Sequence, residues 1–291
     1  AQREEAQREE AQREEERERM SPEQHTIAVI GAGKMGETLL SGLLRAGWPA
    51  SGLIATVRRA ERGEYLQTRY GIRVLPNEEA VREAHVIVIA VKPQDASTLL
   101  ADLGPRVPQG KLVVSICAGL PTSFFEKRLP EGTPVVRVMS NTPALVDQAM
   151  SAISAGSHAR AEHLALTEEM LRPLGKTVRV PESQQDAVTA LSGSGPAYFY
   201  YLVEAMTDAG ILLGLPRQVA HELIVQAALG AAVMLRESGE HPVTLREAVT
   251  SPGGTTISAI RELERHRVRA AVLDAIEAAR DRAREIAAQV D

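Results

Sequence analysis

Cysteine is nearly absent from this sequence: the 291 residues include one, Cys117. No intramolecular disulfide can form, which is typical of proteins from a reducing compartment. No group of cysteines and histidines has the spacing of a structural metal site, and His221-Glu222 lacks the second histidine of a helical zinc motif. We therefore expect no bound metal and a cytoplasmic location.

Two further absences exclude classes of partner. The formal net charge is only −5, and most charges lie in helical stretches of alternating sign, so nucleic acid is not an expected partner. No apolar run reaches the length of a membrane span, and the first residues lack the basic, apolar and small-residue order of a secretory signal. The sequence predicts a chain that is neither secreted nor embedded in a membrane.

The first 19 residues are of low complexity. They contain Ala-Gln-Arg-Glu-Glu three times, followed by more Arg and Glu, and end just before Met20. Glu/Arg pairs favour a solvated helix there, but the segment has no apolar face with which to dock. We interpret residues 1–19 as a charged appendage and Met20 as the natural start.

Short apolar runs alternate with helical patterns between Thr26 and about Val180. Such runs are typical of strands buried on both faces in a doubly wound parallel sheet. They cover residues 26–30, 53–57, 85–91, 111–116 and 134–139, and two more runs, 149–155 and 177–180, flank a predicted helix over 160–174. Residues 20–181 are therefore predicted to form an α/β domain.

After Pro181 the strand patterns stop. Helices are predicted over residues 184–191, 196–213, 216–237, 245–249, 256–265 and 268–290. Two segments, 198–213 and 227–235, are apolar around nearly their whole circumference, which is more than a small monomeric domain can bury. A central core helix is one explanation, but a domain shared by two subunits accounts for the excess better. We expect residues 182–291 to form an all-helical dimerisation domain in a homodimer or a higher oligomer of dimers.

A glycine-rich loop follows the first predicted strand. It reads Gly31-Ala32-Gly33-Lys34-Met35-Gly36 and leads into an amphipathic helix over residues 37–46. Gly31 suits the tight turn, Gly33 the approach of a pyrophosphate and Gly36 close helix–strand packing, while the helix N-terminus attracts the anion. The motif alone is weak evidence, since a glycine-rich loop is the simpler explanation. Its place between strand and helix indicates dinucleotide binding by a Rossmann domain.

The end of the second predicted strand bears on the choice of dinucleotide. It reads Ala55-Thr56-Val57-Arg58-Arg59, without the acidic residue that binds the ribose hydroxyls of NAD. Two guanidinium groups can instead bind a 2′-phosphate, although a pair of solvated arginines is the alternative. The sequence favours NADPH, with NADH as the second choice.

Other cofactor contacts are expected where later strands end, because a dinucleotide crosses the carboxyl edge of such a sheet. The candidates by position are Ala90, Val91, Lys92, Pro93, Ile116, Cys117, Ala118 and Gly119. Asn77 is placed to reach a ribose or adenine, or else to cap a helix. Cys117 is expected to be a small wall residue, because no base can be tied to it as a nucleophile.

The helical half contains a second glycine turn that leads into a helix, Ser251-Pro252-Gly253-Gly254-Thr255-Thr256. Backbone N–H groups of Gly254, Thr255 and Thr256 can bind a carboxylate there, and a threonine hydroxyl can donate to a neighbouring heteroatom. A tight interhelix turn capped by threonine is the alternative. Residues 192–196, Ser-Gly-Ser-Gly-Pro, are predicted to form another such turn, with Pro196 as a first helical residue.

Lysine is missing from the helical half: the chain's lysines are Lys34, Lys92, Lys111, Lys127 and Lys176. The β-hydroxyacid dehydrogenases share the two-domain plan but take the alcohol proton with a lysine of the helical domain. Reduction of an imine requires fewer catalytic groups from the protein, because a protonated C=N bond is already electrophilic and needs mainly positioning and a hydrogen bond to nitrogen. The absence favours reduction of a C=N bond.

Five segments together resemble the pyrroline-5-carboxylate reductase family, and the likeness extends from Thr26 to the C-terminus. They are residues 31–36, 90–94, 141–143, 191–198 and 251–256. The last two are specific as a pair, whereas the first is shared by many dehydrogenases. Two departures stand out: Ser140 replaces the proline usual before Asn-Thr-Pro, and Ala248 replaces an asparagine found in some members.

The resemblance implies roles for particular residues. The cofactor set is Ile30, Gly31, Ala32, Gly33, Lys34, Met35, Gly36, Arg58, Asn77, Ala90, Val91, Lys92, Pro93, Cys117 and Ala118. Gly254, Thr255 and Thr256 would hold the substrate, with the Thr256 hydroxyl bonding the ring nitrogen as the catalytic contact, and Glu182 would border the pocket.

The implied reaction is NADPH-dependent reduction of (S)-1-pyrroline-5-carboxylate to L-proline, with hydride from C4 of the nicotinamide attacking the imine carbon. Two alternatives stay open: a reductase of a related cyclic imine, and a regulator that senses dinucleotide without turnover. Intact glycine turns favour the enzyme over the regulator.

Overall fold

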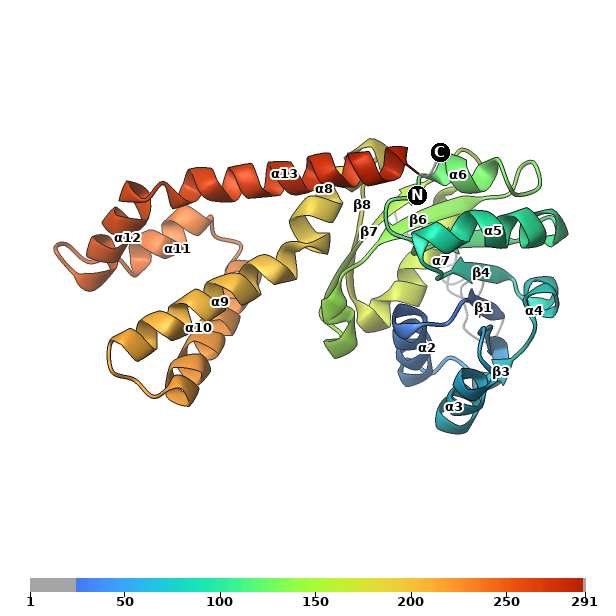
Figure 1. The fold of residues 1–291 in the computed structure, drawn as a ribbon, viewed down its shortest axis with the longest axis horizontal. Helices are drawn as coiled ribbons and strands as arrows, with labels where there is room; N and C mark the ends of the chain where they lie inside the picture. The colour runs from blue at the N-terminus through green and yellow to red at the C-terminus, as the bar shows by residue number, and fades with distance from the viewer. Residues whose placement is uncertain (1–24, 290–291) are drawn as a thin grey trace, which may run out of the picture. The chain divides into compact units, whose positions relative to one another are not determined.

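The computed structural model describes residues 25–289, so the charged appendage predicted over residues 1–19 lies outside the described residues. The chain divides into two compact units (Figure 1). We call the part up to Gly193, together with the residues from Asp281, the sheet unit, and Ser194–Arg280 the helical unit. The division after Gly193 lies twelve residues beyond the predicted domain boundary at residue 181, because a helical path leaves the sheet unit there.

One eight-stranded sheet forms the sheet unit, in the order β3-β2-β1-β4-β5-β6-β7-β8. The strands are β1 Ile27–Ile30, β2 Leu53–Ala55, β3 Arg73–Val74, β4 Val86–Ile89, β5 Leu112–Ser115, β6 Val135–Met139, β7 Ala149–Ala155 and β8 Gly175–Arg179. All neighbours pair in parallel except β6 and β7, which are antiparallel. The predicted doubly wound α/β fold is confirmed, with β3 added and one antiparallel pair corrected.

Both faces of the sheet are covered, and the strand sequences show why. Along β1, Ile27 and Val29 face one core, whereas Ala28 and Ile30 face the other, as the alternation of side chains in a strand dictates. The first core lies under α2 Lys34–Arg45, α3 Ala60–Tyr70 and α7 Ala161–Leu171, and the second under α4 Asn77–Glu83, α5 Pro93–Leu103 and α6 Thr122–Glu126. Short 3₁₀ turns cover Ala50–Gly52, Gly104–Arg106, Thr142–Val146, Arg172–Leu174 and Glu182–Gln184.

Residues 192–196 were predicted to turn, and within them the structure has a single bend, at Ser194, between two helical segments. Helix α8, Gln185–Val188, continues through a π-helical turn, Thr189–Gly193, into α9, Gly195–Leu212. The hydroxyl groups of Thr189 and Ser192 each donate to the carbonyl oxygen four residues back, at 2.9 and 3.3 Å. These bonds hold the π-helical turn up to Gly193. The chain then bends at Ser194, and α9 begins with Pro196 in its first turn, so the placement of Pro196 is confirmed and the turn is shorter than predicted.

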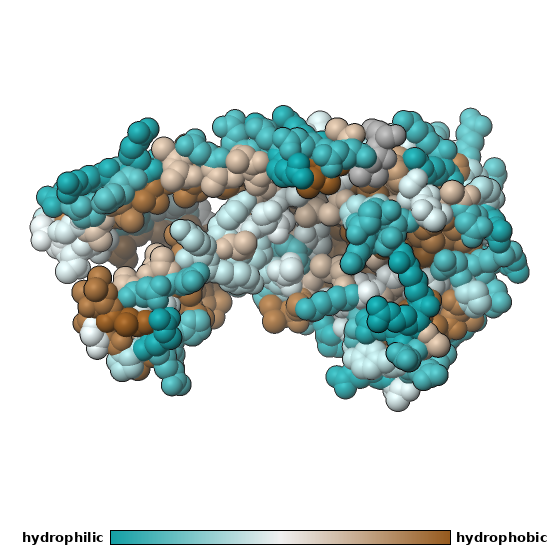
Figure 2. Space-filling view, in the orientation of Figure 1, coloured by the Kyte–Doolittle hydropathy of each residue, from teal (hydrophilic) through white to brown (hydrophobic). Residues whose placement is uncertain are grey.

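The helical unit consists of α9, α10 Arg217–Ser238, α11 Pro242–Ala248, α12 Thr255–Arg265 and most of α13 Val268–Ala288. Of its described residues, only Gly195, Thr207 and Ala220 are buried. Hydrophobic side chains lie on its surface instead (Figure 2), among them Leu212, Leu213 and Leu223. A unit built in this way has no core of its own in a single chain.

Helix α10 is also long and apolar enough, by length and composition alone, to cross a membrane. The sequence prediction that no segment reaches this length is therefore wrong for α10, because its charged residues lie toward its two ends and leave residues 223–235 uncharged. One such helix is weak evidence for a span, since helices that pack against other helices have the same composition.

Candidate functional site

The glycine-rich loop between β1 and α2 packs tightly against Val91 and is hydrogen-bonded to Thr56. Gly31 has a φ of 78°, and a Cβ added to it would collide with the side chain of Val91. Its N–H donates to the Thr56 hydroxyl at 3.0 Å, and the N–H of Ala32 donates to the Thr56 carbonyl at 2.8 Å. The turn at the end of β1 therefore requires glycine at this position.

The other two glycines of the loop differ from each other. A Cβ on Gly36 would lie 2.8 Å from the Val29 side chain, so close packing of α2 on β1 requires glycine there. A Cβ on Gly33 would meet only the Gly31 carbonyl oxygen at 3.9 Å, so the chain itself leaves that space open for a ligand. Gly33 caps α2 without a side-chain hydrogen bond, which leaves the helix terminus to an anion.

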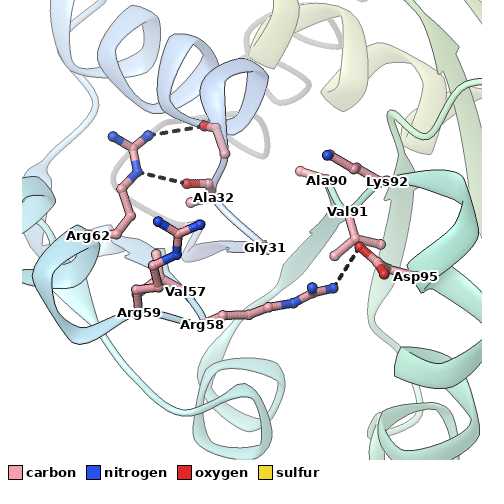
Figure 3. Close-up of a pocket in the computed structure, with 11 residues that line it drawn as sticks. Gly31, Ala32, Val57, Arg58, Arg59, Arg62, Ala90, Val91, Lys92 and Asp95 are labelled. Atoms are coloured by element: carbon pink, nitrogen blue, oxygen red, sulfur yellow. Dashed lines mark hydrogen bonds and ion pairs between the residues drawn. The ribbon is translucent and has the colours of Figure 1, made fainter.

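A cavity of about 410 Å³ opens beside this loop, at the carboxyl ends of β1, β2 and β4 (Figure 3). The residues that line it are Gly31, Ala32, Gly33, Val57, Arg58, Arg59, Arg62, Ala90, Val91, Lys92 and Asp95. Seven of the predicted cofactor residues are brought together here: Gly31, Ala32, Gly33, Arg58, Ala90, Val91 and Lys92. Four cationic side chains and the helix terminus make the cavity a site for a polyanion.

Arg62, which was not assigned from the sequence, ties the loop to its surroundings. Its guanidinium donates to the carbonyl oxygens of Ala32 and Gly33, both at 3.3 Å, and pairs with Glu37 at 2.5 Å. The available signal was its place in the first turn of α3, directly after the segment that follows β2 and contains Arg58.

Glu37 is the anchor for Arg62. Its carboxylate accepts hydrogen bonds from the hydroxyl groups of Tyr65 at 3.2 Å and Tyr70 at 2.7 Å. Burial by itself raises the pKa of Glu37, but the hydrogen bonds from Tyr70, Arg62 and Tyr65 and the charge of Arg62 together lower it. The carboxylate is therefore charged at neutral pH and fixes Arg62 against the loop.

A second cavity of about 280 Å³ lies where β5 and β6 end. Its lining residues are Met35, Leu39, Ile116, Ala118, Met139, Ser140, Asn141, Thr142, Leu171, Leu174 and Gly193. Asn141 donates to the Ser192 carbonyl and accepts from the Met150 N–H, both at 3.1 Å, which fixes this wall to the π-helical turn. The glycine-rich loop contributes Gly33 to the first cavity and Met35 to the second, so the two cavities are suited to the two ends of one dinucleotide.

The remaining predicted cofactor residues line neither cavity. They are Ile30, Lys34, Gly36, Asn77, Pro93 and Cys117, together with Gly119, a candidate by position. Pro76 precedes α4 and Asn77 is its first residue, with no side-chain cap, so the alternative role of Asn77 as a helix cap is wrong.

Cys117 is buried beneath the cofactor edge. Its sulfur lies 3.3 Å from the Val91 carbonyl oxygen and 3.5 Å from that of Ile89, and burial raises the pKa of the thiol to about 11. The group is therefore protonated at neutral pH, as expected for a wall residue rather than a nucleophile.

Glu182 is engaged within the sheet unit. Its carboxylate accepts from the Thr122 N–H at 2.7 Å and the Thr122 hydroxyl at 2.5 Å, and it pairs with the buried Arg137 at 3.3 Å. The Glu182 side chain thus links the start of α6 to the segment that follows β8.

In the helical unit, the predicted carboxylate site begins with a tight turn. The Gly254 N–H donates to the Ser251 carbonyl at 3.1 Å, across Pro252 and a Gly253 with φ of 67°. This is the residue pattern of a type II turn. The prediction that the Gly254 N–H is free for a ligand is therefore wrong, because the turn itself uses it.

Helix α12 starts one residue earlier than predicted, at Thr255, and Gly254 caps it without a side-chain hydrogen bond. Of the three residues predicted to bind the carboxylate, Thr255 and Thr256 keep their N–H groups for a ligand, because the first helical hydrogen bond of α12 is made by Ser258; Thr256 is half-buried. The terminus keeps the character of an anion site after the correction.

Comparison with known proteins gives the same two parts. Residues 26–119 match the family model "NADP oxidoreductase coenzyme F420-dependent", and residues 182–286 match "Pyrroline-5-carboxylate reductase dimerisation". The fold and the cofactor cavity thus define an oxidoreductase that depends on a nicotinamide dinucleotide.

Relatives are similar over nearly the whole chain. The pyrroline-5-carboxylate reductase of Mycobacterium tuberculosis (strain CDC 1551 / Oshkosh) is 42% identical over 89% of this chain and 96% of its own, and that of Methanosarcina acetivorans is 44% identical over 91% and 98%. The solved reductase of Coxiella burnetii is 34% identical with a TM-score of 0.86, covering 90% of this chain and 98% of its own. The Plasmodium falciparum enzyme with NADP bound is 28% identical with a TM-score of 0.80, covering 91% and 99%. The chain belongs to the pyrroline-5-carboxylate reductase family, and the resemblance seen in its motifs is confirmed.

Proposed function

We propose that this protein reduces (S)-1-pyrroline-5-carboxylate to L-proline with NADPH, the last step of proline biosynthesis. The observation that carries the proposal is that a chain of this family has two helix N-termini without a side-chain cap. One is that of α2, beside the cationic cavity, and the other is that of α12, after its type II turn. The first suits a dinucleotide phosphate and the second a small carboxylate.

The residues fit the cofactor. The open space at Gly33 admits the pyrophosphate, and Arg58 and Arg59 at the end of β2 suit the 2′-phosphate that separates NADPH from NADH. NADPH supplies hydride from C4 of its nicotinamide to the imine carbon. We propose the whole predicted cofactor set as its surroundings, with Arg59, Arg62 and Asp95 added.

The protein's own part in the reaction is binding and orientation. The N–H groups of Thr255 and Thr256 hold the substrate carboxylate, and the Thr256 hydroxyl donates to the ring nitrogen, which orients the C=N bond. The one proton that the ring nitrogen gains in the reduction comes from water. Gly254 contributes through its turn rather than its N–H, and we propose that Glu182 borders the substrate pocket in the assembled enzyme.

We propose a homodimer formed through residues 182–291, the predicted dimerisation domain. The exposed apolar side chains of the helical unit support it, since a second copy would cover them. The same packing accounts for the composition of α10 without a membrane. We also propose a cytoplasmic location, where the single thiol stays reduced.

The direct test is NADPH oxidation with pyrroline-5-carboxylate compared with its six-membered analogue. We expect kcat/KM to be higher for the five-membered ring. A preference for the larger ring would assign the related cyclic imine instead, and tight NADP⁺ binding without turnover of either imine would assign the sensing regulator.

Thr256 is the test of the substrate site. Thr256→Ala keeps the backbone N–H groups, so we expect kcat to fall roughly tenfold to a thousandfold with a smaller change in KM, because the hydrogen bond strengthens as the nitrogen gains electron density. Thr256→Ser restores the hydroxyl and should recover much of the rate. A folded Ala variant with the parent kcat would refute the role of the hydroxyl.

A further inference from the structure

We propose that Asp95 sets the strength of NADPH binding by competing with the cofactor's 2′-phosphate for Arg58. The inference rests on the proposed function, because it takes Arg58 as a partner of that phosphate. It adds a specificity-determining residue that lies on a different element, at the first turn of α5.

The two side chains reach each other across the cavity. Arg58 follows β2, Asp95 lies in the first turn of α5, and their charged groups meet at 2.7 Å (Figure 3). Both residues line the cavity, and the figure shows the Arg58 side chain extended from one wall to the other. The guanidinium is therefore already held by a carboxylate before any phosphate arrives.

Charge makes the competition specific. Asp95 is the one acidic residue among the eleven described residues that line the cavity, and Arg62 is already paired with Glu37 outside that set. A 2′-phosphate carries up to two negative charges, so binding at Arg58 breaks the ion pair or crowds a second anion against Asp95. NADH brings only a hydroxyl group to this place and meets neither cost.

Exposure limits the size of the effect. The side chain of Arg58 is 73% exposed and that of Asp95 is 32% exposed, so water and salt screen the pair. The ion pair is weak enough for a phosphate to displace Asp95 from Arg58. It is also strong enough to lower the net affinity of the protein for NADPH. We infer that Asp95 lowers the preference for NADPH below what the arginines alone would give, and that the pair re-forms when NADP⁺ leaves.

The test is a set of four variants in the full-length protein: Asp95→Asn, Arg58→Gln, the double variant and Asp102→Asn. Asp102 is the matched control, because it lies on the same helix and pairs with Arg106 at 3.1 Å without lining the cavity. Dissociation constants for NADP⁺ and NAD⁺ are measured by titration calorimetry at low and high salt.

For Asp95→Asn we expect NADP⁺ to bind about three- to tenfold more tightly, with NAD⁺ changed less than about twofold. The gain should shrink at high salt and vanish in the Arg58→Gln background, whereas Asp102→Asn should change nothing. A purely structural role of Asp95 in α5 would instead weaken both cofactors alike.

The outcomes distinguish a failure of the Asp95 competition from a failure of the Arg58 assignment on which it rests. If Arg58→Gln weakens NADP⁺ selectively but Asp95→Asn brings no gain, Arg58 keeps its role and the competition is refuted. If Arg58→Gln leaves the NADP⁺ to NAD⁺ ratio unchanged, the Arg58 assignment itself fails, and the inference fails with it.

Discussion

The two units of this chain bury their apolar residues in opposite ways. In the sheet unit, every residue of β1 and β4 is at most 1% exposed, and helices cover both faces. In the helical unit, Leu212 is 87% and Leu213 is 83% exposed. Burying one such side chain stabilises a protein by about 1.5–3 kcal/mol, so the proposed dimer would add much of the stability of the helical unit. The sheet unit carries its own core, whereas the helical unit would complete its core only in that dimer.

The largest expected effect comes from a charge on the exposed apolar surface. Leu223, on α10, is 58% exposed in the single chain. Leu223→Glu would bury a carboxylate in the dimer contact, so we expect the dimer dissociation constant to rise at least about 100-fold, with loss of activity at low concentration. Analytical ultracentrifugation measures this directly.

Gln218→Glu is the matched control, since it adds the same carboxylate to an exposed polar position on another face of α10. It should leave the dimer nearly unchanged. A Leu223→Glu protein that remains a dimer at nanomolar concentration would break the comparison between the two units.

A smaller effect is expected from Glu37, which acts within the sheet unit alone. Glu37→Gln removes the charged partner of Arg62, so we expect the unfolding free energy at pH 7 to fall by about 1–2 kcal/mol with the dimer unaffected. Glu61→Gln, at an exposed position on α3, is the control.

The pH dependence gives this prediction a sign. The pKa of Glu37 is lowered in the folded chain, so its stabilisation is present above pH 4.5, the unfolded value, and is lost as the pH falls through the lowered value. Chemical denaturation between pH 6 and 3 should show a flatter curve for Glu37→Gln. An unchanged slope would mean that the carboxylate adds nothing to the fold.

The smallest effect concerns His85, which accepts a hydrogen bond at Nδ1 from the Thr26 N–H at 3.0 Å. Burial, then the charges of Lys111 and His25, lower the pKa of His85. Its neutral form therefore stabilises the fold above pH 6.5, and this stabilisation is lost as the pH falls below that value. We expect about 0.5 kcal/mol or less, because the side chain is largely exposed.

His85→Asn keeps a hydrogen-bond acceptor but does not titrate. Thermal unfolding of this variant between pH 7 and 5 should vary less than that of the parent protein. Equal variation in the two proteins would assign the acid sensitivity to other groups.

The sequence predicted the sheet well where the pattern is local. Buried strands such as β4, which is apolar throughout, and β5, which is apolar up to Ser115, have positions that follow to within one or two residues. The two residues of β3 are too few to form a periodic pattern. The antiparallel direction of β7 depends on how the chain connects β6 to β7, so neither feature can be predicted from a short stretch of sequence.

The site follows the same rule. Gly31, Gly33 and Gly36 are predictable because backbone geometry selects glycine. The contact of Arg58 with Asp95 joins residues 37 positions apart in sequence, and only the folded sheet brings them together. The prediction for the Gly254 N–H was wrong because this group donates to the Ser251 carbonyl within the turn and is not free for a ligand.

The burial of Cys117 has a practical consequence for studying the assembly. With its one native thiol 3% exposed and its pKa raised to about 11, the protein resists thiol-reactive dyes at neutral pH. A cysteine introduced at a solvent-exposed polar position of the helical unit would then be the single reactive thiol of each chain. One fluorophore or spin label per copy could follow the meeting of two chains without any native residue being removed.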